Sequence, residues 1–233
     1  MLNKEGNKYT VIYAAVMVII VAMALAFTAE TLRERQNRNA EIDKKMQLLR
    51  SIKVASTANN AEELFRTYIT SSYIITSAGE RTDGDAFSIN REIEKEVRKP
   101  ANERKLPVYE ATVDGTKKYI IPLYGAGLWG PVWGYVSLNS DRNTVYGATF
   151  GHKGETPGLG AEIETESFSS RFSGKHLLRD GKFTSIAVVK SGQTQGDVDC
   201  VDGISGGTIT SQGVSAMLKN CLQPYEAFLK VEN

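Results

Sequence analysis

The sequence predicts an α+β protein, in which a single N-terminal transmembrane helix precedes one largely antiparallel sheet domain flanked by helices. An uncharged apolar stretch lies close to the N-terminus. In the remaining chain, β-branched and aromatic runs gather in the middle, between segments with helical periodicity. A length of 233 residues allows one domain with appendages.

The apolar stretch covers residues 9–29 and contains no charged residue. At about 1.5 Å per residue, a helix of this length spans roughly 31 Å, close to the hydrocarbon thickness of a bilayer. A cleaved signal peptide would have a shorter apolar core and a small-residue cleavage site, which Ala22, Ala24 and Ala26 could mimic. The length favours a retained transmembrane helix that follows a short tail at residues 1–8.

The charges on either side of the span leave its orientation open. Lys4 and Lys8 precede it, and five Lys or Arg residues follow between positions 33 and 45. By the positive-inside rule this count places the following domain in the cytoplasm. A large trailing domain can nevertheless cross the membrane largely regardless of its charge.

Residues 30–58 are predicted to form a helical stalk or linker. Ile42, Met46, Leu49 and Ile52 recur at three- and four-residue steps, which places them on one face of a helix. This apolar stripe could pack on a partner protein or on the chain's own domain.

The domain itself is expected at residues 59–233. It should open with a short helix through Tyr68, capped by Asn60 with Glu63 three positions later. Asp114-Gly115 predicts a hairpin turn between two strands. Strands are predicted at 73–77, 106–113, 118–123, 133–138, 144–150 and 184–190. Helices are predicted at 161–172 and 211–229, the latter interrupted near Pro224.

Composition excludes several functions. Lys and Arg number 28 against 27 Asp and Glu, so binding of nucleic acid through bulk charge is not expected. Two cysteines and two histidines, none at ligand spacing, predict no metal site and no iron–sulfur cluster. The chain also lacks a G-x-G-x-x-G fingerprint, so it should not bind NADH itself.

The most unusual segment is Asp202–Ser211, DGISGGTITS, directly before the last predicted helix. Its glycines let the backbone approach a ligand, and amides at a helix N-terminus attract phosphate. The hydroxyls of Ser205, Thr208 and Thr210 can add hydrogen bonds or a point of covalent attachment. A glycine turn with a Ser or Thr cap is the simpler interpretation, and both remain open.

Two other motif assignments fail for this segment. A Walker-type phosphate loop needs a lysine after its last glycine, and none is present. The G-x-S-x-G pattern of a hydrolase requires a histidine after the serine, whereas His152 and His176 both precede Ser205.

Three motifs carry a family resemblance. Ser205-Gly-Gly-Thr208 resembles the Ser/Thr-Gly-Ala-Thr flavinylation motif of periplasmic FMN-binding domains. Glu155–Gly160, ETPGLG, resembles the loop that lies against the flavin in that family, and Gly125–Gly134 resembles its GLWG-type segment. Nearly the whole chain is similar to the C-subunit family of the sodium-translocating NADH:quinone oxidoreductase.

The resemblance implies FMN joined by a phosphoester to Thr208, with Thr210 as the fallback acceptor. Gly207 stands where alanine is usual in the motif. We expect apolar walls for the flavin ring from Leu128, Trp129 and Leu159, and a phosphate or ring contact from Lys190. The remaining expected cofactor-binding residues are Ser205, Gly206, Gly207, Glu155, Thr156 and Gly160.

The resemblance also implies a role. The chain would carry electrons inside a six-subunit membrane complex that oxidises NADH, reduces ubiquinone or menaquinone and exports sodium, and it would have no complete activity alone. A separate flavin transferase would attach the flavin from FAD with the help of a metal ion. The domain would lie in the periplasm, anchored to a bacterial inner membrane by its single span.

Two alternatives accompany this interpretation. One is the homologous G-subunit of the ferredoxin:NAD oxidoreductase complex, which uses the same motif. The other is a non-enzymatic, membrane-anchored module whose glycine loop holds a phosphate ligand reversibly.

Overall fold

The computed structural model describes residues 7–230. The expected tail at residues 1–8 lies almost entirely outside this range. Contacts between residues divide the chain into two compact units, one ending at Asp43 and the other beginning at Lys44.

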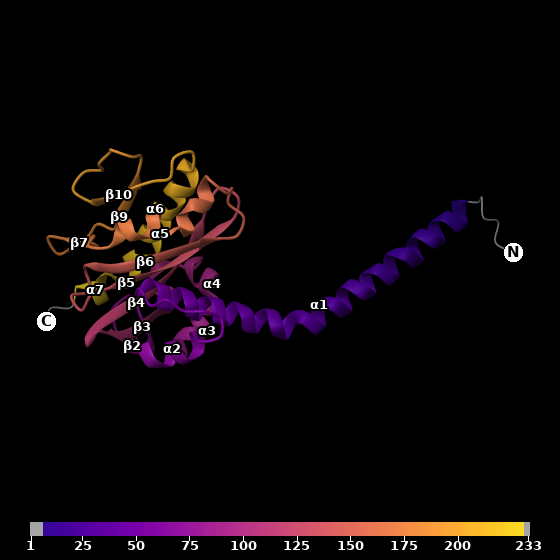
Figure 1. Ribbon diagram of the computed structural model, residues 1–233, viewed down its shortest axis with the longest axis horizontal. Coiled ribbons are helices and arrows are strands. Elements are labelled where there is room, and N and C mark those ends of the chain that lie inside the picture. The colour runs from indigo at the N-terminus through magenta and orange to yellow at the C-terminus, as the bar shows by residue number, and fades with distance from the viewer. Residues whose placement is uncertain (1–6, 231–233) are drawn as a thin grey trace. The chain divides into compact units, whose positions relative to one another are not determined.

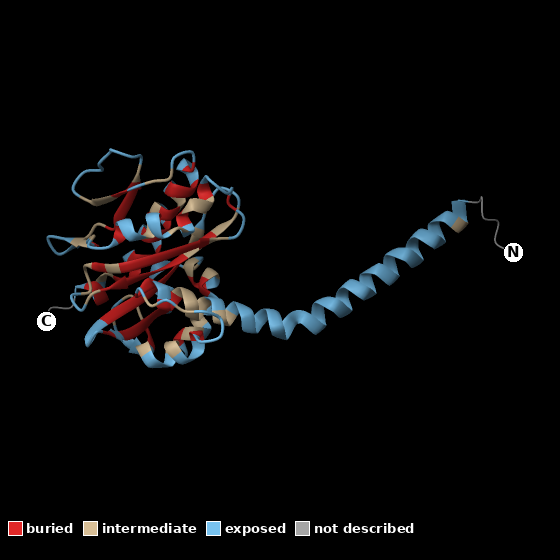
Figure 2. Ribbon diagram, in the orientation of Figure 1, coloured by how far each residue is buried: buried red, intermediate tan, exposed pale blue. Residues whose placement is uncertain are grey.

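The first unit consists of most of α1 (Asn7–Ser51), one continuous helix of 45 residues. Its apolar side chains between Val11 and Phe27 are exposed, as the pale blue ribbon of Figure 2 shows. The helix is long and apolar enough to cross a membrane.

The second unit is built on a six-stranded sheet with the strand order β2-β1-β3-β4-β5-β6. All neighbouring pairs in this sheet are antiparallel, which confirms the predicted fold class. The strands are β1 (Ile69–Ile75), β2 (Arg81–Thr82), β3 (Leu106–Val113), β4 (Thr116–Ala126), β5 (Pro131–Leu138) and β6 (Val145–His152).

Local sequence determines several boundaries in this sheet. Asp114 and Gly115 both have positive φ, at 49° and 71°, and form the predicted two-residue turn between β3 and β4. Strand β1, in contrast, is longer than its local sequence predicts. It begins at Ile69 rather than at Tyr73, because Ile69 pairs with Ala111 of the neighbouring strand β3.

One face of the sheet is covered by the end of α1, by α2 (Ala61–Tyr68) and by α3 (Ala86–Arg91) (Figure 1). Leu48, Leu49 and Ile52 are buried in a core with Tyr109 and Tyr135 of the sheet. Half of the apolar stripe predicted in the stalk therefore packs on the chain's own domain. The compact unit begins ahead of the boundary expected at residue 59.

Asn60 precedes α2 as expected, but its side chain does not cap that helix. Its Oδ1 instead accepts hydrogen bonds from the Thr57 backbone N–H, at 2.7 Å, and from the Thr57 hydroxyl, at 3.0 Å. The predicted capping box is wrong, because Asn60 closes the turn before the helix.

The other face of the sheet carries α6 (Thr208–Leu222) and a separate parallel pair, β9 (Ile186–Val189) and β10 (Asp199–Asp202). Phe150, Phe168 and Phe172 pack together in its core. Figure 1 shows α5, α6, β9 and β10 on this side. The smaller elements of the unit are α4 (Ile93–Val97), η1 (Ala101–Glu103), β7 (Leu178–Arg179), β8 (Lys182–Phe183), η4 (Gln223–Tyr225) and α7 (Glu226–Leu229).

The helix predicted at 161–172 is broken into η2 (Gly160–Glu164), α5 (Glu166–Ser169) and η3 (Ser170–Phe172). Thr165 is extended, and its side chain accepts a hydrogen bond from the Phe168 N–H to start α5. A Thr cap in the middle of a helical pattern divides it.

Candidate functional site at the start of helix α6

The glycine segment before α6 is folded tightly against the end of β9. The Gly203 N–H donates to the Val189 carbonyl at 2.7 Å, and the Ile204 N–H donates to Ser211 Oγ at 2.9 Å. Gly206 has φ of +73°, which a residue with a Cβ adopts at a cost of about 1 kcal/mol. The sequence thus turns sharply into the helix.

Helix α6 begins at Thr208, three residues ahead of the predicted start at Ser211. Gly207 occupies the N-cap position, and no side chain of the described residues caps the helix. The first amides of a 15-residue helix therefore point outward with a partial positive charge. Thr208 is exposed at this end, so its hydroxyl lies beside an anion-attracting surface.

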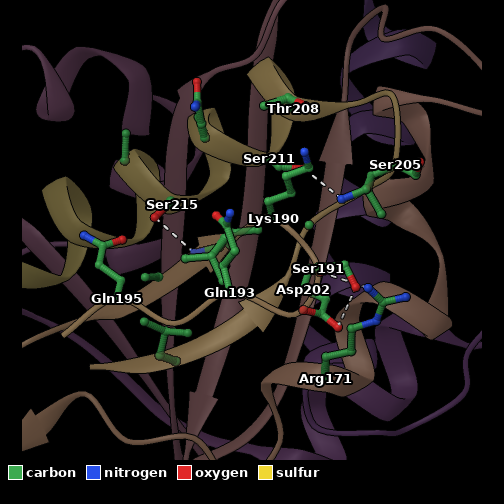
Figure 3. Close-up of a pocket in the computed structure, with 18 of the residues that line it drawn as sticks. Arg171, Lys190, Ser191, Gln193, Gln195, Asp202, Ser205, Thr208, Ser211 and Ser215 are labelled. Atoms are coloured by element: carbon green, nitrogen blue, oxygen red, sulfur yellow. Dashed lines mark hydrogen bonds between the residues drawn. The ribbon is translucent and has the colours of Figure 1, made fainter. Parts of the chain in front are cut away.

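A groove of about 1680 Å³ runs along one face of α6, between this helix and β9 with the loop that follows β9. Ser205, Gly206 and Thr208 line the groove at the start of α6. Lys219, in the last turn of the helix, lines it as well. Because residues three and four apart share a helix face, Ser211, Gln212 and Ser215 line the same groove. Figure 3 shows this arrangement of hydroxyl and amide side chains.

Lys190 brings a cation to the groove. It follows the last residue of β9 and is exposed. In Figure 3 its side chain extends from the strand end toward the first turn of α6. The parallel pairing of β9 with β10 holds this strand end next to the glycine segment.

Asp202, the first residue of the glycine segment, fixes the loop beyond Lys190. Its carboxylate accepts hydrogen bonds from the Gly192 N–H at 3.1 Å and from Ser191 Oγ at 3.3 Å. Its carbonyl accepts from Arg171 Nη1 at 2.8 Å. The wall of the groove is therefore tied to the segment that carries Thr208.

Glu155 and Thr210 lie in the interior, with exposed fractions of 4% and 1%. The Thr210 hydroxyl donates to Glu155 Oε2 at 2.5 Å, and the Trp129 N–H donates to Glu155 Oε1 at 2.9 Å. Both side chains are thus committed to contacts within the protein. Thr210 is buried and its hydroxyl already donates to Glu155, so a modifying enzyme has no access to it in this state, and each Glu155 oxygen already accepts one hydrogen bond.

The three expected ring walls lie at the surface. Leu128, Trp129 and Leu159 are all exposed, with 68% of Trp129 accessible, and Ile209 joins them as an exposed apolar residue. None of these four is among the described residues that line the groove. Thr156 is also exposed outside the groove, whereas Gly160 is buried against Glu155 and Thr210.

The fold thus brings Ser205, Gly206, Thr208 and Lys190 together around one groove. It places Gly207 at the helix start, while Glu155, Gly160 and Thr210 support that start from inside. The sequence prediction missed the groove residues Arg171, Gln193, Gln195, Gln212 and Ser215. Gln212 could have been found, since it lies one helical turn after Thr208.

The fold and the motif define a class of protein: a sheet domain that presents a glycine–threonine helix start, behind an N-terminal helix able to span a membrane. Residues 127–223 match the FMN-binding domain family. The chain therefore contains an FMN-binding domain, and within the residues that the structure describes α1 is its candidate membrane anchor.

Proteins that are similar to this chain over nearly its whole length identify a particular family of FMN-binding proteins. The chain is 32% identical to the C-subunit of the Na⁺-translocating NADH-quinone reductase of Vibrio anguillarum, covering 91% of this chain and 89% of that one. It is 31% identical to the same polypeptide of Vibrio vulnificus (strain YJ016), with coverages of 92% and 90%.

Two solved structures that are similar to this chain belong to the same family. The crystal structure of the C-subunit from Parabacteroides distasonis is 47% identical, with a TM-score of 0.79, and covers 87% of this chain and 98% of that one. The structure of Shewanella oneidensis NqrC is 26% identical, with a TM-score of 0.67 and coverages of 83% and 100%. The chain belongs to the NqrC family, the C-subunits of Na⁺-translocating NADH-quinone reductases.

Proposed function

We propose that the chain carries electrons within a Na⁺-translocating NADH-quinone reductase, on an FMN joined to Thr208 by a phosphoester. The observation that carries the proposal is the placement of the Thr208 hydroxyl. It is exposed, at the amide-rich start of a long helix, and at the end of a groove that Lys190 also lines.

The residues present fit the phosphate of such a flavin. The α6 N-terminus favours negative charge, and Lys190 adds a full positive charge on the facing wall. Gly206 and Gly207 let the chain fold closely on itself at the helix start, since a Cβ on Gly206 would meet Leu159 Cδ2 at 2.6 Å and one on Gly207 would meet Ile204 Cβ at 3.1 Å. The phosphate would thus be held by helix amides, Lys190 and the ester oxygen.

Two surfaces could receive the flavin ring. The groove offers amide and hydroxyl groups, among them Gln193, Gln212 and Ser215. The exposed apolar residues Leu128, Trp129 and Leu159 offer flat walls of the kind expected from the sequence. In either position the bound FMN supplies electron transfer, and the chain supplies attachment, orientation and electrostatics.

Attachment requires one bond exchange. Thr208 Oγ forms a bond to the phosphorus on the FMN side of FAD, the bond from that phosphorus to the AMP phosphate oxygen breaks, and AMP leaves. The hydroxyl proton passes to a base. Thr208 has no histidine or lysine beside it in the sequence to act as this base, which supports modification by a separate flavin transferase with its metal ion.

The rest of the activity is assigned to partners. The relatives from Vibrio are named as one subunit of a Na⁺-translocating NADH-quinone reductase. Within residues 7–230 one helix could span a membrane, and a single helix cannot by itself line an ion path, so we assign sodium export to other subunits of a six-subunit complex. We assign NADH oxidation and the reduction of ubiquinone or menaquinone to those subunits as well, since the chain lacks a dinucleotide fingerprint. We place the domain in the periplasm, anchored in a bacterial inner membrane.

The experiment is production of the full chain together with a flavin transferase, followed by denaturing electrophoresis. The wild-type band should fluoresce as a flavin, and Thr208→Ala should abolish the fluorescence while the domain still folds. Thr116→Ala is the control, because Thr116 is an exposed threonine at the start of β4 that does not line the groove, so its loss should leave the band fluorescent. A fluorescent band in Thr208→Ala would refute the assignment.

The same experiment separates the alternative of a reversible phosphate-binding module. The free amides of α6 would hold any phosphate ligand, but such a ligand leaves on denaturation and dialysis. The G-subunit of the ferredoxin:NAD oxidoreductase is less well supported, since the similar proteins from Vibrio and Parabacteroides are quinone-reductase polypeptides.

A further inference from the structure

The buried carboxylate of Glu155 joins its own loop to two segments that are distant in the sequence. Its Oε1 accepts from the backbone of Trp129, in the loop after β4, and its Oε2 accepts from Thr210, in the first turn of α6. Its own backbone N–H donates to His152 Nδ1 at 3.1 Å, at the end of β6. A buried charged group is expensive unless it is fully bonded, and here both oxygens have donors.

Glycines make room for this carboxylate on two sides. A Cβ on Gly160 would lie 2.6 Å from Glu155 Oε2 and 2.5 Å from Thr210 Oγ1. A Cβ on Gly127 would overlap Glu155 Oε1 and approach Val132 Cγ1 at 2.9 Å. The Glu155 carboxylate therefore fits its site only because positions 127 and 160 are glycines.

We propose that Glu155 is a positioning residue for the attachment of flavin at Thr208. It acts through Thr210, which lies two residues beyond Thr208 in the same helical turn, and fixes the direction in which the Thr208 hydroxyl leaves the helix. The same carboxylate holds the Trp129 loop against that turn. This inference rests on the proposed function, in which Thr208 is the acceptor.

The physical reason is the sensitivity of group transfer to geometry. The Thr208 hydroxyl must reach the phosphorus in line with the departing AMP, and a misplacement of about 1 Å can lower such a rate on the order of a hundredfold. Thr208 itself is exposed and lies in a turn without a side-chain cap. Besides the bond from the Ile204 N–H to Ser211 Oγ, the hydrogen bond from Thr210 to Glu155 anchors this turn to the protein interior.

The test measures the initial rate of flavinylation of the full chain in detergent, with purified flavin transferase, FAD and Mg²⁺. Glu155→Leu removes both hydrogen bonds at similar volume, and Thr210→Val removes one without changing shape. Both should lower the rate about tenfold or more. The loss should appear in kcat for flavin transfer rather than in KM for the protein substrate.

Conservative variants should restore the rate. Glu155→Gln keeps a carbonyl oxygen for the Trp129 N–H and an amide that can donate to Thr210 Oγ1, and Thr210→Ser keeps the hydroxyl. Both should stay within about threefold of wild type, as should the matched control Glu166→Gln on the exposed first turn of α5. The double variant Glu155→Leu/Thr210→Val should be no slower than Glu155→Leu alone.

Amide hydrogen exchange supplies a readout that needs no flavin. The Trp129 amide should exchange faster in Glu155→Leu and stay protected in Thr210→Val, because only the former loses its acceptor. Folding is checked by circular dichroism, and if Glu155→Leu does not fold, the comparison of Thr210→Val with Thr210→Ser decides.

The outcomes separate the two proposals. If wild type gains no flavin on its Thr208 peptide, the proposed function fails. If wild type is labelled there and folded Thr210→Val and Glu155→Leu are labelled at the wild-type rate, the positioning role of Glu155 is wrong and the proposed function stands.

Discussion

Replacing Gly160 by alanine tests the packing beneath the helix start without any flavin. The backbone of Gly160 does not have a positive φ, so alanine is allowed there and the effect comes from its methyl group alone. That methyl group would lie 2.5 Å from Thr210 Oγ1 and 2.6 Å from Glu155 Oε2, well inside van der Waals contact. The two buried groups must separate to admit it.

The expected magnitude follows from the bond that is lost. A hydrogen bond to a charged group contributes about 1.5–3 kcal/mol, and overpacking a dense interior costs about 1–3 kcal/mol. The same movement of Glu155 and Thr210 breaks the hydrogen bond and relieves the overpacking, so the two costs do not add in full. We therefore expect the free energy of unfolding to fall by about 2–3 kcal/mol. For a unit of this size, each kcal/mol lowers Tm by about 2–4 °C, so Tm should fall by about 4–12 °C.

The assay is thermal unfolding of the full chain in detergent, followed by near-ultraviolet circular dichroism. Gly154→Ala is the matched control, since its Cβ would meet nothing within 4 Å and its φ is not positive. It should change Tm by no more than about 2 °C, as expected for an ordinary surface change of about 0.5 kcal/mol. Equal Tm values for Gly160→Ala and wild type would refute the argument.

Two further predictions concern titrating groups away from the helix start. Burial raises the pKa of the Cys221 thiol to about 11, so at pH 8 iodoacetamide should alkylate the partly exposed Cys200 and spare Cys221 until the chain unfolds; equal labelling of both in the folded chain would contradict this, as read by peptide mass. Burial opposes the charge of the Glu110 carboxylate, but hydrogen bonds from Tyr73 and Lys117 outweigh it and hold the pKa of Glu110 below its ordinary value of 4.5. Its charged form therefore stabilises the fold above that value, and the stabilisation is lost as the pH falls further. The Tm difference between wild type and Glu110→Gln should be largest near pH 7 and shrink below pH 4.5; a difference that grows on acidification would show the sign to be wrong.

Strands and turns were predictable where one local signal decided them. The apolar, β-branched run from Leu106 to Val113 predicted the strand with its observed ends. Asp114-Gly115 predicted the hairpin, because only such residues adopt two consecutive positive φ values readily. The apolar stretch near the N-terminus likewise predicted an exposed apolar helix from length and composition alone.

Features that depend on contacts distant in the sequence were not predictable. The pairing of β9 with β10, which places Lys190 beside the glycine segment, involves a short strand with a weak sequence pattern. The hydrogen bond between Glu155 and Thr210 spans 55 positions, and a carboxylate in a Pro-Gly loop gives no local sign that it is buried. From the family motifs we expected Glu155 to contact the flavin and Thr210 to be the fallback acceptor. The motifs did not predict that the two side chains bond to each other.

The most direct measurement of the central claim is the mass of the full chain produced with a flavin transferase, followed by mapping of its peptides. The account predicts an increase equal to FMN less one water, located on the peptide that contains Thr208 and absent from Thr208→Ala. An unchanged mass from cells in which the transferase modifies another substrate would contradict it, as would an FMN increment located on any other residue.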